Sequence, residues 1–228
     1  MKAFCFDLFD TLADAHRHLE QTESDALGVP KAVWHAAFWE ERLCYDRGMG
    51  YVATVREMVD RACSLLPASY CPTDAQRQAA AAARSERLRL ALTEIDPVIV
   101  ETLRQLKARG FLLGLISNAD VCDTKHWPVS PLAPLFDDVI FSCDVHLVKP
   151  DRAIYLLSAA HLGVRPEEAV FVGDGGSDEL AGAKAAGMRT VCTEYLRVHD
   201  EEKRRGIHRS ADHIISHFTE LPALVQQA

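Results

Sequence analysis

The apolar positions of this 228-residue chain follow two different rhythms. Short, nearly continuous apolar runs that end in a polar or small residue predict buried strands at 3–7, 111–118, 137–142, 169–174 and 188–193. Apolar residues spaced three and four apart predict helices at 97–109, 150–164, 177–187 and 217–227. Strands that alternate with helices of this length are typical of a parallel sheet. The pattern therefore predicts an α/β protein with a Rossmann-like core and helices on both faces of its sheet.

The stretch between residues 14 and 94 shows no strand signal and is predicted to be helical. Helical apolar faces occur at 33–43 and 51–66, and Thr73 with Gln76 forms a capping box ahead of a run of strong helix formers. An insertion of about 80 residues is too long to be a loop. We therefore expect an all-helical cap domain at 14–94 and a core domain formed by 1–13 and 95–228.

Two glycines, Gly48 and Gly50, interrupt the cap helices. The turn that they allow is expected to direct Arg47 or Tyr51 toward a site on the core. A plain helix–helix connection with a solvated arginine is an equally good interpretation of the same residues.

Composition excludes several classes of protein. The net charge of −8 and the pI of about 5.7 leave no basic patch for nucleic acid, and no apolar run is long enough to span a membrane. Seven cysteines without CxxC or CxxH spacing predict reduced thiols rather than disulfides or a zinc site. The first strand begins at residue 2 or 3, so we expect no signal peptide and a cytoplasmic protein. The sequence leaves a monomer and a homodimer open.

Reactive side chains stand near the ends of four predicted strands. In open parallel sheets ligands bind at the carboxyl ends of the strands. One acid after a strand is usually a helix cap, and one lysine before a proline is usually solvated. Four such positions in chain order instead indicate a single site, formed by Asp7, Ser117, Asn118, Lys149, Asp174 and Asp178.

The three acids of this set define its chemistry. Asp7, Asp174 and Asp178 stay ionised together only if a cation offsets them. Carboxylate oxygens suit Mg²⁺, which shares its coordination shell with substrate phosphate. Lys149 adds fixed positive charge, and Ser117 is a candidate partner for phosphate oxygens. A positioned Asp7 carboxylate is a known type of nucleophile. The pattern predicts phosphoryl transfer from a small phosphorylated molecule.

Four stretches, "FDLFDTL", "LISNAD", "VKPDRAIY" and "VGDGGSDELAGAKAAGM", together make the chain resemble the haloacid dehalogenase (HAD) superfamily. The helical insertion after the first stretch resembles the subfamily I cap. The resemblance implies a Mg²⁺-dependent phosphatase with Asp7 as covalent nucleophile, and Thr11 four residues later fixes this register over Asp10. The implied catalytic set is Asp7, Thr11, Ser117, Asn118 and Lys149, and the implied metal ligands are Asp7, Asp174, Asp178 and the backbone carbonyl of Phe9.

Phe9 departs from the pattern of family phosphatases, which usually carry an acid at this position. That acid protonates the leaving alcohol and then activates water, a contribution of about 10²–10⁴ in rate. Asp10 takes the place of the usual glycine, and neighbouring side chains of an extended chain point to opposite sides. We do not expect Asp10 to substitute. Phe9 and Asp10, with Arg47 and Tyr51 of the cap, are the candidate substrate contacts.

An apolar residue at position 9 resembles the 2-haloacid dehalogenases of the same superfamily. A halide leaves without a proton, so those enzymes need no acid there, but they also need no Mg²⁺. Asp174 and Asp178 favour phosphoryl transfer and Phe9 favours dehalogenation. The two metal acids make the phosphatase the first hypothesis. A dehalogenase-like hydrolase and a catalytically weak ligand-binding protein remain the alternatives.

Overall fold

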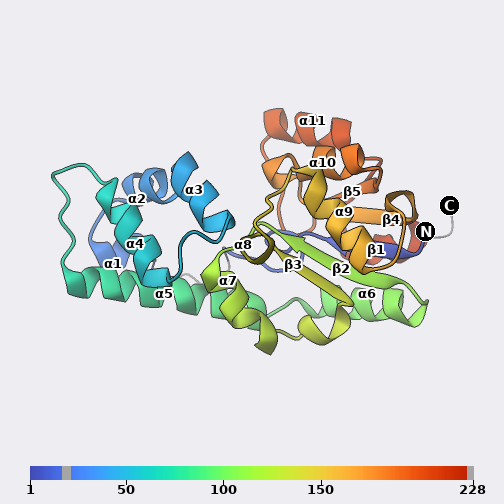
Figure 1. Cartoon of the computed structure of the whole chain (residues 1–228), viewed down its shortest axis with the longest axis horizontal. Helices are drawn as coiled ribbons and strands as arrows, with labels where there is room; N and C mark the ends of the chain where they lie inside the picture. The colour runs from blue at the N-terminus through green and yellow to red at the C-terminus, as the bar shows by residue number, and fades with distance from the viewer. Residues whose placement is uncertain (17–21, 225–228) are drawn as a thin grey trace.

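The computed structural model describes residues 1–16 and 22–224. Helices α1 to α5, within residues 23–93, lie to one side of the β-sheet and the helices that pack on it (Figure 1). The predicted fold class, a parallel-sheet core with a helical insertion after the first strand, is confirmed. The division of the chain at residues 13/14 and 94/95 stays a prediction.

The core is one parallel sheet of six strands within the described residues, in the order β3-β2-β1-β4-β5-β6. The chain winds outward from β1 in one direction and then returns to β4 on its other side. This arrangement places a switch point at the carboxyl ends of β1 and β4, where open sheets bind ligands. The strands are β1 (Ala3–Phe6), β2 (Leu112–Ser117), β3 (Asp138–Phe141), β4 (Ala169–Gly173), β5 (Arg189–Thr193) and β6 (His213–Ile215).

Strand β6 was not among the predicted strands. It has only three residues and lies at the edge of the sheet, where His213 and Ile214 are exposed and Ile215 alone is buried. A single inward-facing residue gives no alternating pattern to detect. Its pairing with β5, Thr193 opposite Ile215, makes it a strand.

Successive side chains of β1 point to opposite faces of the sheet and contribute to the apolar cluster on each face. Phe4 and Phe6 belong to the apolar cluster under α6, whereas Ala3 and Cys5 belong to the cluster under α9 and α10. Figure 1 shows α9 to α11 on one side of the sheet and α6 on the other. The core helices are α6 (Pro97–Ala108), α7 (Val121–His126), α8 (Ser142–Val145), α9 (Arg152–His161), α10 (Glu179–Ala186), α11 (Glu201–Ser210) and α12 (Leu221–Leu224).

The predicted helix at 217–227 is shorter in the structure. Residues Phe218–Glu220 form a 3₁₀ turn, and α12 follows it. Residues 225–227 of the predicted helix lie outside the described residues.

The inserted helices are α1 (Glu23–Leu27), α2 (Lys31–Phe38), α3 (Glu41–Gly48), α4 (Val55–Ser64) and α5 (Asp74–Thr93). The capping box that starts α5 is confirmed, with the backbone N–H of Gln76 donating to the Thr73 hydroxyl at 3.3 Å. The apolar face predicted at 33–43 is divided between α2 and α3, because Glu40 caps a new helix there. Trp34, Phe38 and Met58 belong to a separate apolar cluster of this insertion.

Candidate active site

Asp7 follows the last residue of β1, at the switch point of the sheet. Its backbone N–H continues the sheet by donating to Val172 of β4 at 2.9 Å. Its Oδ2 accepts a hydrogen bond from the Thr11 hydroxyl at 3.1 Å, and the same hydroxyl accepts from the backbone N–H of Asp174 at 3.0 Å. Thr11 is fully buried. It therefore ties the loop after β1 to the loop after β4.

Lys149 reaches the same place from the segment after α8. Its ammonium contacts Oδ1 of Asp7 and lies 2.6 Å from Oε2 of Glu179. The Asn118 side chain holds the lysine backbone on both sides, donating to the Lys149 carbonyl at 3.0 Å and accepting from its N–H at 2.7 Å. Asn118 thus fixes the direction from which Lys149 approaches Asp7.

The three acids that the structure brings together are Asp7, Asp174 and Glu179. One oxygen of each lies within 4.8 Å of the others, and all three residues are buried. Asp178 is not in this group. It is exposed, in the left-handed region with φ 51°, on a 3₁₀ turn (Gly176–Asp178), and faces a shallow cavity beside α11. Glu179 stands where the sequence analysis expected Asp178.

Burial makes the charges of this group interact strongly. It raises the pKa of Asp7, with Lys149 opposing the rise and Asp174 adding to it. It raises the pKa of Glu179 to about 8, again with Asp7 adding and Lys149 opposing. Burial disfavours the charge of Lys149, but Asp7 and Glu179 outweigh it and raise the pKa of this lysine. Burial and the repulsion among the acids therefore favour their neutral forms, because one lysine does not offset three ionised carboxylates.

Asp10 is engaged away from this cluster. Its carboxylate contacts the Arg197 guanidinium and lies 3.6 Å from the His16 ring. Burial alone would raise the pKa of Asp10, but His16 and Arg197 lower it below its usual value. Asp10 has φ 61° and packs in a position that glycine favours. A carboxylate held ionised by an arginine is a poor proton donor, which agrees with the expectation that Asp10 does not substitute for an acid at position 9.

Phe9 is partly buried and packs against the apolar cluster under α6. Ser117 is buried at the carboxyl end of β2. Behind it, the Ser142 hydroxyl accepts from the Ala119 N–H at 3.0 Å and ties the loops after β2 and β3 together. The roles expected of Phe9 and Ser117 stay predictions.

Arg47 is buried between the insertion and the core. Its guanidinium lies 3.5 Å from Asp120, which follows β2, and stacks over the Phe38 ring at 4.0 Å. Arg84 of α5 meets the same Asp120 at 2.7 Å. Burial would raise the pKa of Asp120, yet Arg84 and Arg47 lower it. The interpretation of Arg47 as a solvated residue is wrong, and its contact with substrate stays a prediction.

The turn at Gly48 and Gly50 docks on α8. A Cβ on Gly50 would collide with the carbonyl oxygen of Cys143. His146 faces the carbonyl of Met49 at 2.7 Å, and the Tyr51 ring stacks on His146 with 6.2 Å between centroids. Tyr51 is half exposed. The predicted turn is therefore present, and it lies against the core.

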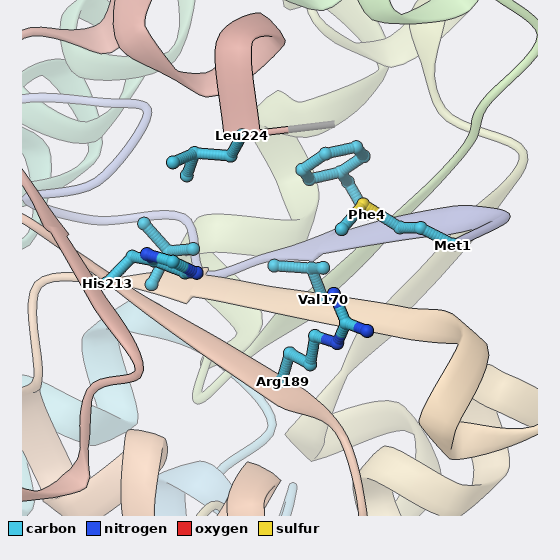
Figure 2. Close-up of a pocket in the computed structure, with 7 residues that line it drawn as sticks. Met1, Phe4, Val170, Arg189, His213 and Leu224 are labelled. Atoms are coloured by element: carbon cyan, nitrogen blue, oxygen red, sulfur yellow. The ribbon is translucent and has the colours of Figure 1, made fainter. Parts of the chain in front are cut away.

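A second cluster of possible metal ligands and a cavity are distinct from this site. Cys192, Glu194 and His208 lie within 4.8 Å of one another, but Glu194 already accepts two hydrogen bonds from Arg204, at 2.6 and 2.7 Å. A cavity of about 80 Å³ lies at the amino-terminal end of the strands, the edge opposite to Asp7. Figure 2 shows its lining, which includes Met1, Phe4, Val170, Arg189, His213 and Leu224.

Sequence reasoning missed Glu179, Arg197 and His199. The ring of His199 lies 2.9 Å from Oδ2 of Asp174, and only 6% of this side chain is exposed. Arg197 and His199 belong to an irregular segment after β5, without a pattern of their own. Glu179 did carry a signal, since it adjoins Asp178 in the quoted motif.

Comparison with known proteins identifies the family. A family profile described as "Hydrolase: haloacid dehalogenase-like hydrolase" matches residues 1–187. The chain belongs to the haloacid dehalogenase-like hydrolases. This result confirms the family resemblance and makes the protein a hydrolase.

Relatives of this HAD hydrolase include both expected activities. It is 28% identical over 216 residues to a glyceraldehyde 3-phosphate phosphatase from Methanopyrus kandleri, which covers 90% of this chain and 88% of the relative. It is 27% identical over 197 residues to (S)-2-haloacid dehalogenase 4A from Burkholderia cepacia, covering 84% and 82%. The solved 2-haloacid dehalogenase from Pseudomonas syringae pv. Tomato DC3000 has a TM-score of 0.68, 26% identity and full coverage of both chains.

In the part of the HAD hydrolase that the structure describes, no helix has the length and apolar character that crossing a bilayer requires.

Proposed function

We propose that this HAD hydrolase is a Mg²⁺-dependent phosphatase of small phosphorylated metabolites that works through an aspartyl-phosphate on Asp7. The observation that carries the proposal is the buried group of Asp7, Asp174 and Glu179 around a single lysine. Three buried carboxylates need more positive charge than Lys149 supplies. The phosphatase activity in the name of the Methanopyrus relative supports the same substrate class.

The donor set fits Mg²⁺. It offers only carboxylate oxygens, which suit a hard cation that keeps part of its water shell. Asp7, Asp174 and Glu179 would hold the ion, and the carbonyl of Phe9 is a further proposed ligand. We assign the third acid to Glu179 in place of Asp178, because Asp178 faces solvent. The bound ion would neutralise charge on the transferring phosphoryl group.

The residues of the chain divide the remaining work. Asp7 attacks phosphorus, and the Thr11 hydroxyl holds Oδ2 of the nucleophile in place. Lys149, held by Asn118, offsets the negative charge of the phosphoryl oxygens. Ser117 and the cap residues Arg47 and Tyr51 are proposed as substrate contacts. The seven free cysteines are consistent with work in a reducing compartment such as the cytoplasm.

The missing acid at position 9 sets the rate. Phe9 cannot protonate a leaving alcohol, and Asp10 is paired with Arg197. We therefore expect slow turnover of alkyl phosphates and faster turnover of phosphates whose leaving groups need no proton.

A 2-haloacid dehalogenase is the second candidate. Phe9 favours it, because a halide leaves without a proton, and the Burkholderia and Pseudomonas relatives carry this activity in their names. Asp174 and Glu179 oppose it, since a carboxylate that attacks carbon gains nothing from a cation that draws charge from it.

Two variants test the nucleophile. Asp7→Asn should abolish phosphate release from p-nitrophenyl phosphate with Mg²⁺ present, whereas Asp10→Asn should keep a substantial fraction. Isotopically labelled substrate should leave a trapped phosphoryl group on wild type and none on Asp7→Asn. An Asp7→Asn protein that still releases phosphate and still carries label would contradict the proposal.

A further inference from the structure

We propose that His199 is a positioning residue for Asp174, holding that carboxylate in the orientation in which it binds the metal ion. The inference rests on the proposed function, because it assumes that Asp174 is a metal ligand. His199 lies in the segment between β5 and α11. None of the residues proposed above for hydrolysis comes from this segment.

Both oxygens of Asp174 have fixed partners in the structure. His199 Nε2 lies 2.9 Å from Oδ2, and the backbone N–H of Gly176 donates to Oδ1 at 2.9 Å. An ionised carboxylate only accepts hydrogen bonds, so His199 donates from Nε2. Each oxygen keeps a second lone pair for a cation. The two donors together fix the rotation of the carboxyl group about its Cβ–Cγ bond.

The contact between His199 and Asp174 is buried and does not lie on the protein surface. Only 6% of its side chain is exposed, and so is 6% of the Asp174 side chain. Val198, the residue before it, is 60% exposed. Alternate side chains of this irregular segment therefore face different surroundings, and the histidine is the one that reaches the acid cluster.

The segment that carries His199 is anchored at several points. The Tyr195 hydroxyl donates a hydrogen bond to the Asp96 carboxylate at 3.0 Å. The Glu194 carboxylate accepts a hydrogen bond from Arg204 of α11. Arg197 contacts Asp10, in the loop that follows the nucleophile. One segment thus contacts the loops after β1 and β4, which carry two of the three acids. A support of this kind holds a ligand more firmly than a free side chain.

Partners that hydrogen-bond to metal-ligating carboxylates usually contribute about 10–100-fold in metal affinity or activity. We expect His199→Ala to weaken Mg²⁺ binding by that factor, measured by isothermal titration calorimetry on the metal-free protein. The Mg²⁺ concentration for half-maximal activity should rise in parallel, while kcat at saturating Mg²⁺ changes much less.

Two variants separate positioning from folding. His199→Gln places an amide N–H at the distance of Nε2 and should recover most of the affinity. Val198→Ala removes an exposed neighbour and should bind Mg²⁺ like wild type. Circular dichroism and thermal melting without metal show whether His199→Ala is folded; if it is not, the affinity of His199→Gln relative to Val198→Ala decides.

Asp174→Asn distinguishes a failure of the proposed metal site from a failure of the positioning role of His199. If it loses Mg²⁺ binding and folded His199→Ala binds as tightly as wild type, the positioning role of His199 is overturned and the proposed metal site stands. If His199→Ala is unfolded, Mg²⁺ binding by His199→Gln as tight as by Val198→Ala supports positioning by an N–H donor, and weak binding by His199→Gln with normal binding by Val198→Ala overturns it. Unchanged binding by Asp174→Asn overturns the metal site and, with it, the role of His199.

Discussion

Under the proposed mechanism position 9 governs protonation of the leaving group, since Phe9 stands two residues after Asp7, the proposed nucleophile, and has no proton to give. We expect Phe9→Asp to accelerate hydrolysis of an alkyl phosphate. General acid–base help is worth about 10²–10⁴ in good geometry, and an unsupported new carboxylate will capture less. The gain should be small for p-nitrophenyl phosphate if phosphorylation of Asp7 limits the rate, because that leaving group needs no proton.

The same variant separates the two candidate activities. A dehalogenase would gain no phosphatase activity from Phe9→Asp and would lose turnover of 2-chloropropionate, because a charge replaces an apolar wall. Phosphate and chloride release by both proteins, measured side by side, gives the answer. A lack of both products from both proteins would favour the ligand-binding alternative.

Glu179 and Asp178 are neighbours with opposite environments. Loss of an outer partner of a ligand usually costs about 10–100-fold in affinity, so loss of a ligand should cost at least as much. We therefore expect Glu179→Gln to weaken Mg²⁺ binding by about tenfold or more, and Asp178→Asn to change it little. Calorimetric titration of both variants tests this; the reverse order would restore Asp178 as the ligand.

The motif around these two acids shows where sequence reasoning stops. Asp7 and Asp174 directly follow β1 and β4, so the sheet sets their direction, whereas Asn118 sets the direction of Lys149. Ser177 and Asp178 both have positive φ, on a turn that re-aims the following side chain. The letters "SDEL" do not reveal that turn, and Asp178 was expected at the site from its place just after the strand at 169–174 as well as from the family resemblance.

At the scale of elements, the contact between the Gly48–Gly50 turn and α8 sets how the insertion meets the core. Gly50 has φ 73°, and a Cβ there would strike the Cys143 carbonyl. Gly110 has φ 84° with open space around it. Strain of this type costs about 1–3 kcal/mol.

We expect Gly110→Ala to show the strain alone and Gly50→Ala to lose more stability, because the collision is added to the strain. Urea unfolding of both variants measures the difference. Equal losses would mean that the turn shifts freely away from α8.

The same scale separates predictable from unpredictable elements. The capping box at Thr73 and Gln76 and the Pro97 helix start are local signals, and both are present in the structure. The break between α2 and α3 and the short β6 depend on contacts distant in sequence. Arg197 and His199 belong to an irregular segment, where no periodicity marks a functional side chain.

At the scale of the whole molecule, α7 carries buried charge where the insertion meets the core. Burial and the neighbouring charge of Asp120 raise the pKa of Asp123 from 3.8 to about 7, with Arg84 and Arg47 opposing the rise. The folded protein then holds a proton that the unfolded chain releases at about pH 4. This group therefore favours folding at low pH, and its contribution is lost as pH rises toward about 7.

Asp123→Asn removes that titration. The free energy of unfolding of the variant minus that of wild type should increase from pH 5 to pH 8. The increase should be on the order of a few kcal/mol, because the pKa of Asp123 is shifted by about three units. Urea unfolding of both proteins at the two pH values, with EDTA present, measures the change. A difference between the proteins that does not vary with pH would contradict the buried-proton account.

The most direct test of the central claim compares metal dependence with product. Purified protein is offered glyceraldehyde 3-phosphate and 2-chloropropionate in separate reactions, each with Mg²⁺ and with EDTA, and released phosphate and chloride are measured. We predict phosphate release that requires Mg²⁺ and no chloride release under either condition. Chloride release that persists in EDTA, without phosphate release in Mg²⁺, would contradict the account.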